Sequence, residues 1–205
     1  MRVELLFVTP NAERAIETAG RTSYLSFGRQ GKNTDKKFIR MLVKRGHYSV
    51  LEHAYATFRI SGVSRSFTHQ LVRHRLCSFT QQSQRNVNES NFNYIEPKSI
   101  KENSKTHSLF AGFMAEAKRA YSELQRLGIK NEDARFVLPN AVESQIVVTA
   151  NLREWRHIIE LRGSPDAQWE IRKVAIEILK TLKNNAPTVF EDFEIDEKES
   201  FVTKI

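Results

Sequence analysis

The sequence contains a single cysteine, Cys77, among 205 residues. One cysteine excludes an internal disulfide framework, and no paired cysteine and histidine spacing of the zinc-ribbon kind occurs, so we expect no metal site. No apolar run is long enough to span a bilayer, and the first residues lack the features of a signal peptide. We therefore expect a cytoplasmic protein that does not associate with membranes.

The glycine-rich signatures that usually hold nucleotide phosphates, G-x-G-x-x-G and the P-loop, are also missing. Any nucleotide must then be held by side chains and helix ends. Lys and Arg number 32 against 24 Asp and Glu, which gives a net charge of +8. This excess favours a phosphorylated or polyanionic partner, but it does not separate nucleic acid from a nucleotide.

Hydrophobic periodicity predicts an α+β fold with a mixed sheet flanked by long helices, in a single domain covering residues 1–205. Three strands are expected, at 3–8, 55–60 and 144–150. Six helices are expected, at 11–19, 34–45, 64–73, 108–127, 151–161 and 166–184, together with a short helical turn that carries Arg135 and ends at Pro139. We expect Asn11, Ser64, Asn131 and Asn151 to cap helices, and Gly62 to end the second strand. Residues 86–106 are predicted to form an exposed excursion, and the acidic C-terminal segment to lie at the periphery.

The most informative segment is the run RHRLCSFTQQSQRN, residues 73–86. It places Arg73, His74, Arg75 and Arg85 around a series of hydroxyls and carboxamides. Neighbouring guanidinium groups repel one another unless an anion or a carboxylate lies between them. An anionic ligand is therefore the first hypothesis, and a solvated helix face is the alternative.

Other segments offer candidates with competing interpretations. Helical spacing places Arg153 and His157 on one face, whereas Trp155 is expected in the core. His74 is predicted to be neutral, because its imidazolium form is disfavoured beside arginines. Cys77 is interpreted as a buried thiol rather than a nucleophile, and Ser83 as a binding group, because no base supported by an aspartate is identifiable.

Several motifs together resemble one enzyme family. The segment His47 to His53 is followed by Gln70-Leu71-Val72-Arg73-His74-Arg75, and Ser83 comes after seven further residues. Agreement continues through residues 134–139, 151–154, 161–162 and 167–170. In this pattern the chain resembles the flavin-dependent thymidylate synthases over most of residues 20–180.

The resemblance implies FAD and NADPH as cofactors and methylenetetrahydrofolate as co-substrate in the methylation of dUMP to dTMP. It also implies a homotetramer with active sites between subunits, which bind folate and dUMP. A basic nucleic-acid-binding module is the competing function, motivated by the net charge. The resemblance implies no nucleic-acid partner.

Individual roles are carried over from the family by motif position. Arg162 is expected to be catalytic, through stabilisation of negative charge on the uracil ring. The residues implied to contact FAD are Ser49, Arg73, His74, Arg75, Gln81, Asn151, Arg153 and His157. Those implied to surround dUMP are Gln70, Arg73, Gln81, Gln82, Ser83, Gln84, Arg85, Arg135 and Arg162.

Two positions depart from the family pattern. Asn86 stands where the family commonly has an aromatic residue, so a ring contact is not expected there. His157 occupies a position that is either Asn or His in the family, which affects how it contacts the flavin.

Overall fold

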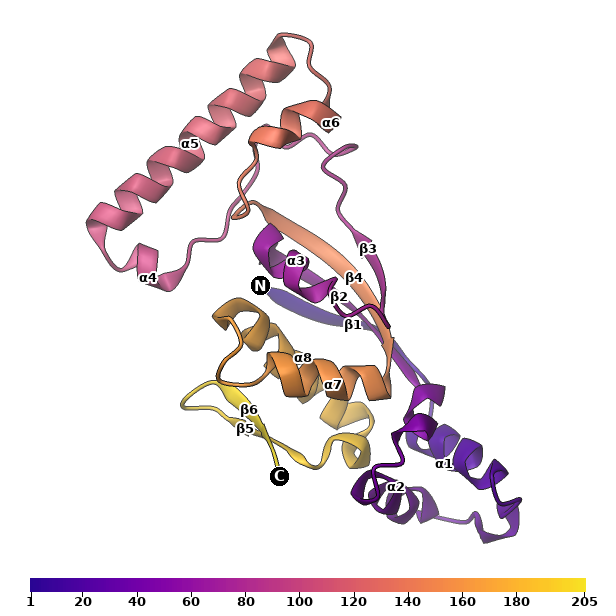
Figure 1. Ribbon diagram of the computed structural model, residues 1–205. Helices are drawn as coiled ribbons and strands as arrows, with labels where there is room; N and C mark the ends of the chain where they lie inside the picture. Colours follow the sequence, from indigo (N-terminus) through magenta and orange to yellow (C-terminus); the bar gives the residue numbers. More distant parts are fainter. The chain divides into compact units, whose positions relative to one another are not determined.

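The computed structural model describes residues 1–205 and confirms the predicted α+β class (Figure 1). A mainly antiparallel sheet has the strand order β1-β2-β4-β3. Its strands are β1 (Arg2–Val8), β2 (Tyr55–Ser64), β3 (Ser78–Gln81) and β4 (Glu143–Asn151). The chain forms two compact units, and several strands contribute residues to both of them.

The first unit comprises Met1–Arg2, Ile60–Gln70 and Thr80–Ile146. Its helices are α3 (Arg65–Leu71, which ends in the second unit), α4 (Lys98–Lys101), α5 (Ser104–Arg126) and α6 (Asn131–Ala134), followed by the 3-10 turn η3 (Arg135–Val137). The long helix α5 buries Met114 and Ala117 against Phe92 and Val142 in a small apolar cluster. This cluster is the core that supports α5.

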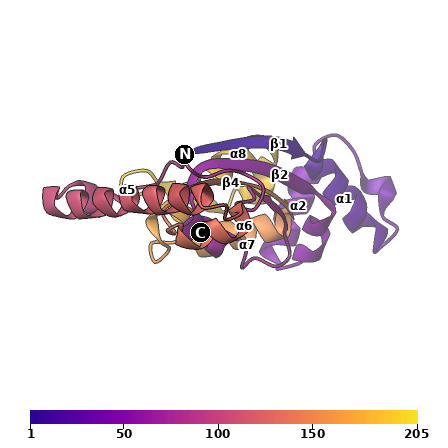
Figure 2. The ribbon, with the colours of Figure 1, turned by 90° about the horizontal axis from the view of Figure 1, so that it is seen from above.

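The second unit comprises Val3–Arg59, Leu71–Phe79 and Val147–Ile205. It contains α1 (Ala12–Thr22), α2 (Thr34–Lys44), α7 (Leu152–Arg162), α8 (Trp169–Asn185), the 3-10 turns η1 (Phe27–Arg29), η2 (Tyr48–His53) and η4 (Pro187–Phe190), and the hairpin β5 (Phe193–Asp196) and β6 (Phe201–Lys204). Helices α1 and α2 contact each other, as Figure 2 shows. Helix α7 contacts η2 and β6 and lies beside α8 (Figure 1).

Strand β2 forms because its side chains alternate between apolar and polar. Ala56, Phe58 and Ile60 are fully buried, as the period-two pattern predicts. The prediction that Gly62 ends the strand is wrong, since β2 continues to Ser64. Gly62 has a φ of +68°, and a Cβ there would lie 2.9 Å from the Met1 nitrogen. A glycine is needed here for close backbone approach within the strand.

Helix α7 starts where the sequence indicates. The Asn151 side chain accepts a hydrogen bond from the Glu154 amide at 2.8 Å, which caps the helix. Trp155 is fully buried, packs edge-on against Phe58 at 5.1 Å and donates its indole N–H to the Ala56 carbonyl. This packing fixes the rotation of α7 and therefore the direction in which its polar face points.

Other caps follow the prediction only in part. The Ser64 hydroxyl accepts from the Phe67 amide and caps α3 as expected. Asn11 and Asn131 do not cap with their side chains. Asn11 adopts a left-handed conformation and uses its backbone carbonyl. The Asn131 side chain instead accepts from Gln125 on α5 at 2.5 Å, and Lys130 is the residue before α6.

Three further expectations are corrected. Helix α3 ends at Leu71, so Arg73 lies in the following turn rather than on the helical face predicted through residue 73. Residues 86–106 are not wholly exposed, because Phe92 and Glu89 are buried. The C-terminal segment is not peripheral, because β5 and β6 pair and bury Phe193 and Val202.

Helix α5 begins at Ser104, four residues before the predicted start, because the Asn103 side chain caps it. None of the helices combines the length and the apolar character needed to cross a bilayer.

Candidate active site

A cavity of about 890 Å³ opens in the second unit. Three segments that are far apart in the sequence supply its walls: turn η2, the turn after α3, and helix α7, with β6 at the edge. The lining residues are Tyr48, Glu52, Arg73, His74, Arg75, Leu76, Asn151, Arg153, Glu154, Arg156, His157, Glu160 and Lys204. This volume accommodates a nucleotide-sized ligand.

Six of the eight residues expected to contact FAD line this cavity, namely Arg73, His74, Arg75, Asn151, Arg153 and His157. The two others lie elsewhere. Ser49 lines a second cavity of about 920 Å³ in the same unit, together with Arg45 and His47. Gln81 belongs to the first unit, where its amide donates to Thr68 at 2.8 Å and to Ser144 at 3.4 Å.

The cavity lining has five cationic side chains and three carboxylates, so its formal charge is positive. Arg73 and Arg75 are exposed, and Arg153 pairs with Glu52 at 2.5 Å, with both side chains about half exposed. A guanidinium held by one exposed carboxylate can exchange that partner for a phosphate at low cost, because exposed ion pairs contribute only about 0–1 kcal/mol. The cavity therefore suits an anionic ligand.

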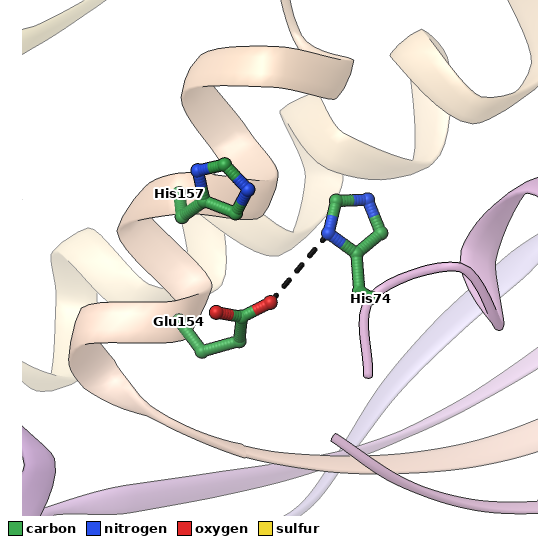
Figure 3. Close-up of side chains that lie close together, drawn as sticks. All are labelled: His74, Glu154 and His157. Atoms are coloured by element: carbon green, nitrogen blue, oxygen red, sulfur yellow. Dashed lines mark ion pairs between the residues drawn. The ribbon is translucent and has the colours of Figure 1, made fainter. Parts of the chain in front are cut away.

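A polar chain joins helix α7 to the turn that carries the buried His74. Arg162 is the last residue of α7, and its Nε donates a 3.0 Å hydrogen bond to Nε2 of His74. On the other side of the same ring, Nδ1 lies 3.5 Å from Oε1 of Glu154 (Figure 3). His157 stands edge-on to His74, with ring centroids 5.7 Å apart. The turn that carries His74 and helix α7 therefore meet within the second unit.

The pKa of His74 is lowered to about 4, mainly by burial and also by the neighbouring Arg162 and His157. The prediction that this imidazole is neutral near pH 7 is confirmed. The main cause is different from the one expected, since desolvation acts more strongly than neighbouring charge and the neighbours that act are Arg162 and His157. Burial also raises the pKa of the Glu154 carboxyl.

His74, Glu154 and His157 are a potential metal cluster, since their ligand atoms lie within 4.8 Å of one another. Two features oppose a cation. Nε2 of His74 already accepts from Arg162, and the guanidinium adds a positive charge at this distance. A divalent ion would have to overcome this repulsion, so the geometry favours a hydrogen-bonded chain over metal coordination.

The residues expected around dUMP are divided between the two units. Arg73 and Arg162 belong to the second unit and the other seven to the first. Within the first unit, Arg85 forms an ion pair with Glu132 at 2.7 Å, and Arg135 donates to the Glu132 carbonyl at 3.0 Å. Two of the expected anion-binding arginines therefore share one neighbour.

The carboxamides of the same segment are held by hydrogen bonds. Gln82 donates its side-chain amide to Glu89 at 2.9 Å. The Ser83 hydroxyl accepts from the Arg85 and Asn86 amides and so stabilises the turn that carries them. Gln70 and Gln84 are half-buried, and Asn86 is exposed.

Sequence reasoning missed several residues of these sites. Arg65 lies near Arg135 and Glu89 in the first unit, and burial lowers the pKa of its guanidinium. Tyr48, Glu52 and Lys204 line the cavity in the second unit. The motif from His47 to His53 already contained two of them. No sequence pattern indicates that Lys204 lines the cavity, because its position depends on the pairing of β5 with β6.

A cationic cavity of this size, lined in part by the buried His74 and Glu154, is suited to a phosphorylated ligand. A family model described as thymidylate synthase complementing protein matches residues 4–188. Flavin-dependent thymidylate synthase of Geobacter sulfurreducens is 43% identical over 200 residues, which cover 94% of this chain and 86% of the relative.

Two further relatives carry the same name. The protein of Corynebacterium glutamicum is 43% identical over 202 residues, covering 90% of this chain and 81% of the relative. The protein of Clostridium tetani is 38% identical over 213 residues, which cover 93% of this chain and 86% of the relative. The chain therefore belongs to the flavin-dependent thymidylate synthase family and is an enzyme. This result argues against the hypothesis of a basic nucleic-acid-binding module.

Proposed function

We propose that the protein methylates dUMP to dTMP, with methylenetetrahydrofolate as carbon donor and NADPH-reduced FAD as hydride source. The observation that carries the proposal is the cavity beside α7. It gathers cationic and hydrogen-bonding side chains from three segments, and these segments coincide with the motifs of the family. The folate donates the one-carbon unit, and reduced flavin supplies the electrons that turn it into a methyl group.

Residues of the cavity are assigned to FAD in this proposal. Arg73, Arg75 and Arg153 neutralise its phosphates, because a guanidinium can bind phosphate oxygens through two parallel N–H groups. His74, Asn151 and His157 contact it through hydrogen bonds or ring faces. Ser49 and Gln81 complete the set from other subunits, if the protein is the proposed homotetramer.

The dUMP site is assigned to Gln70, Arg73, Gln81, Gln82, Ser83, Gln84, Arg85, Arg135 and Arg162. Arg85 and Arg135 are suited to the phosphate, because their shared neighbour Glu132 keeps two guanidinium groups close together. Arg162 is assigned to the uracil ring, where a cation stabilises the charge that develops as C5 becomes nucleophilic. We further propose one functional domain over residues 1–205 and a cytoplasmic location.

The test is formation of dTMP by the purified protein. We expect product only when dUMP, methylenetetrahydrofolate, FAD and NADPH are all present, and omission of any one should remove it. Product that forms equally well without flavin and NADPH would contradict the proposal, as would no product from a protein shown to bind both FAD and dUMP. Binding of RNA or DNA with steep salt dependence, and none of dUMP, would support the competing function instead.

Cys77 is expected to take no part in turnover. Cys77 is half-buried rather than fully buried as expected, and burial together with the negative charge of Glu154 raises the pKa of its thiol to about 12. The thiolate is therefore scarce at neutral pH, and the thiol is a poor nucleophile. We expect Cys77→Ala to keep kcat within about twofold of the parent, since removal of one partly buried sulfur costs little. A loss of activity of a hundredfold or more in a folded variant would show that the thiol is needed.

A further inference from the structure

The Glu154 carboxylate has a use that its sequence position does not indicate. As the third residue after Asn151, it matches the second half of a capping box, in which the carboxylate turns back to the helix start. Here Asn151 alone provides the cap, and the Glu154 carboxylate points toward His74 (Figure 3). Glu154 and His74 are both buried, with side-chain exposures of 7% and 4%. A buried carboxylate placed beside an imidazole constrains where that imidazole carries its proton.

The neighbours of its two ring nitrogens assign the tautomer of His74. The guanidinium of Arg162 can only donate, so Nε2 of His74 must accept its 3.0 Å hydrogen bond. Because the ring is neutral near pH 7, its one proton lies on Nδ1. That nitrogen lies 3.5 Å from Oε1 of Glu154, and an ionised carboxylate can only accept. The three side chains are consistent with one another in this tautomer and not in the other.

We propose that Glu154 is a positioning residue, which holds His74 in the Nδ1–H tautomer so that Nε2 can orient the Arg162 guanidinium. This inference rests on the proposed function, because Arg162 is the residue assigned to the uracil ring. The hydrogen bond to His74 uses Nε, which leaves the four N–H donors of the two Nη groups for a ligand. Glu154 itself touches neither substrate nor flavin in this scheme.

The same arrangement predicts how substitutions of Glu154 act. Glutamine at this position can donate to Nδ1 as well as accept from it, so it no longer excludes the opposite tautomer, in which Nε2–H faces the Arg162 N–H. The donor pair then repels, and Arg162 loses its fixed orientation. A carboxylate that sets an imidazole tautomer in the Ser-His-Asp triad contributes several orders of magnitude to kcat. Glu154 acts one residue further from the reaction, so we expect Glu154→Gln to lower kcat by about 10- to 100-fold.

The first arm of the experiment reads the tautomer directly. Nitrogen-15 spectra of the imidazoles in the protein as purified, assigned with a His74→Gln variant, should show His74 protonated at Nδ1. With only six histidines the spectrum can be resolved. In Glu154→Gln the proton should move wholly or partly to Nε2. A parent protein with the proton on Nε2 overturns the proposal, whether or not the protein makes dTMP and whether or not the variant folds.

The second arm reads turnover. Glu154→Gln should lower kcat with little change in the KM for dUMP and in bound flavin, because only transition-state orientation is lost. Glu154→Asp keeps the charge and should retain more of kcat than Glu154→Gln. Glu177→Gln, on the exposed face of α8, is the matched control and should leave kcat unchanged. An unchanged kcat in Glu154→Gln, or loss of the flavin in both Glu154 variants, overturns the positioning role.

Discussion

Replacement of Arg162 by alanine should reduce turnover by at least about 10²- to 10³-fold, the usual cost of removing one electrostatic donor at a reacting oxygen. Arg162 is half-buried at the end of α7, where His74 holds its Nε. Alanine removes both the charge and the donors that are assigned to the uracil carbonyl and N3. The measurement is kcat for dTMP formation at saturating dUMP, with bound flavin determined from its absorption.

Flavin should remain bound to Arg162→Ala, because the cationic residues that line the cavity are unchanged. Arg162→Lys should also be strongly impaired, since an ammonium keeps the charge but loses the planar fork. Arg126→Ala is the control, because Arg126 is an exposed arginine paired with Glu123 on α5. A kcat within a few-fold of the parent would remove Arg162 from the catalytic role, and loss of flavin together with activity would reassign it to cofactor binding.

The second large effect is expected on stability, at Asp192. Arg156 is buried, and it donates to the Val189 carbonyl and to both carboxylate oxygens of Asp192. Its guanidinium also lies over the rings of Phe193 at 4.8 Å and Tyr48 at 5.4 Å. Asp192→Ala leaves this buried charge without its counter-ion. We expect a loss of about 3–5 kcal/mol in the free energy of unfolding.

Urea denaturation at a fixed flavin concentration measures this loss. The neighbouring Glu191 provides a matched control, because its ion pair with Arg40 at 2.8 Å lies on the surface. Glu191→Ala should cost no more than about 1 kcal/mol. Equal losses in the two alanine variants would show that burial of Arg156 does not make its partner essential.

Local patterns in the sequence predicted strand β2 and helix α7, the elements that support and line the cavity. The alternation through Ala56, Phe58 and Ile60 predicted β2, and the Asn151 cap predicted α7, since each depends on neighbours only a few residues away. The spacing of Arg153 and His157 correctly placed both on the face that lines the cavity. Helical periodicity is reliable here because Trp155 is buried on the opposite face.

Features that depend on distant contacts were not predictable from the sequence. The C-terminal segment was expected at the periphery from its acidic composition, yet Val202 packs against Gly163, where an added Cβ would lie 2.7 Å from its Cγ2. Lys204 reaches the cavity only through that packing. Likewise, the position of Glu154 three residues after Asn151 matches a local capping box, and nothing in the sequence shows that His74 lies beside it. The early end of α3 also escaped prediction, since the basic residues that follow it fit a helical period.

The proposed function depends on FAD binding in the cavity beside α7. The most direct test is an equilibrium titration of the flavin-free protein with FAD, compared with Arg153→Ala and with Arg40→Ala as the control on the surface. We predict saturable binding to the parent and to Arg40→Ala, and an affinity at least about tenfold lower for Arg153→Ala, since a charge-assisted hydrogen bond to phosphate contributes about 1.5–3 kcal/mol. No binding by the folded parent, or equal affinity in all three proteins, would contradict the assignment.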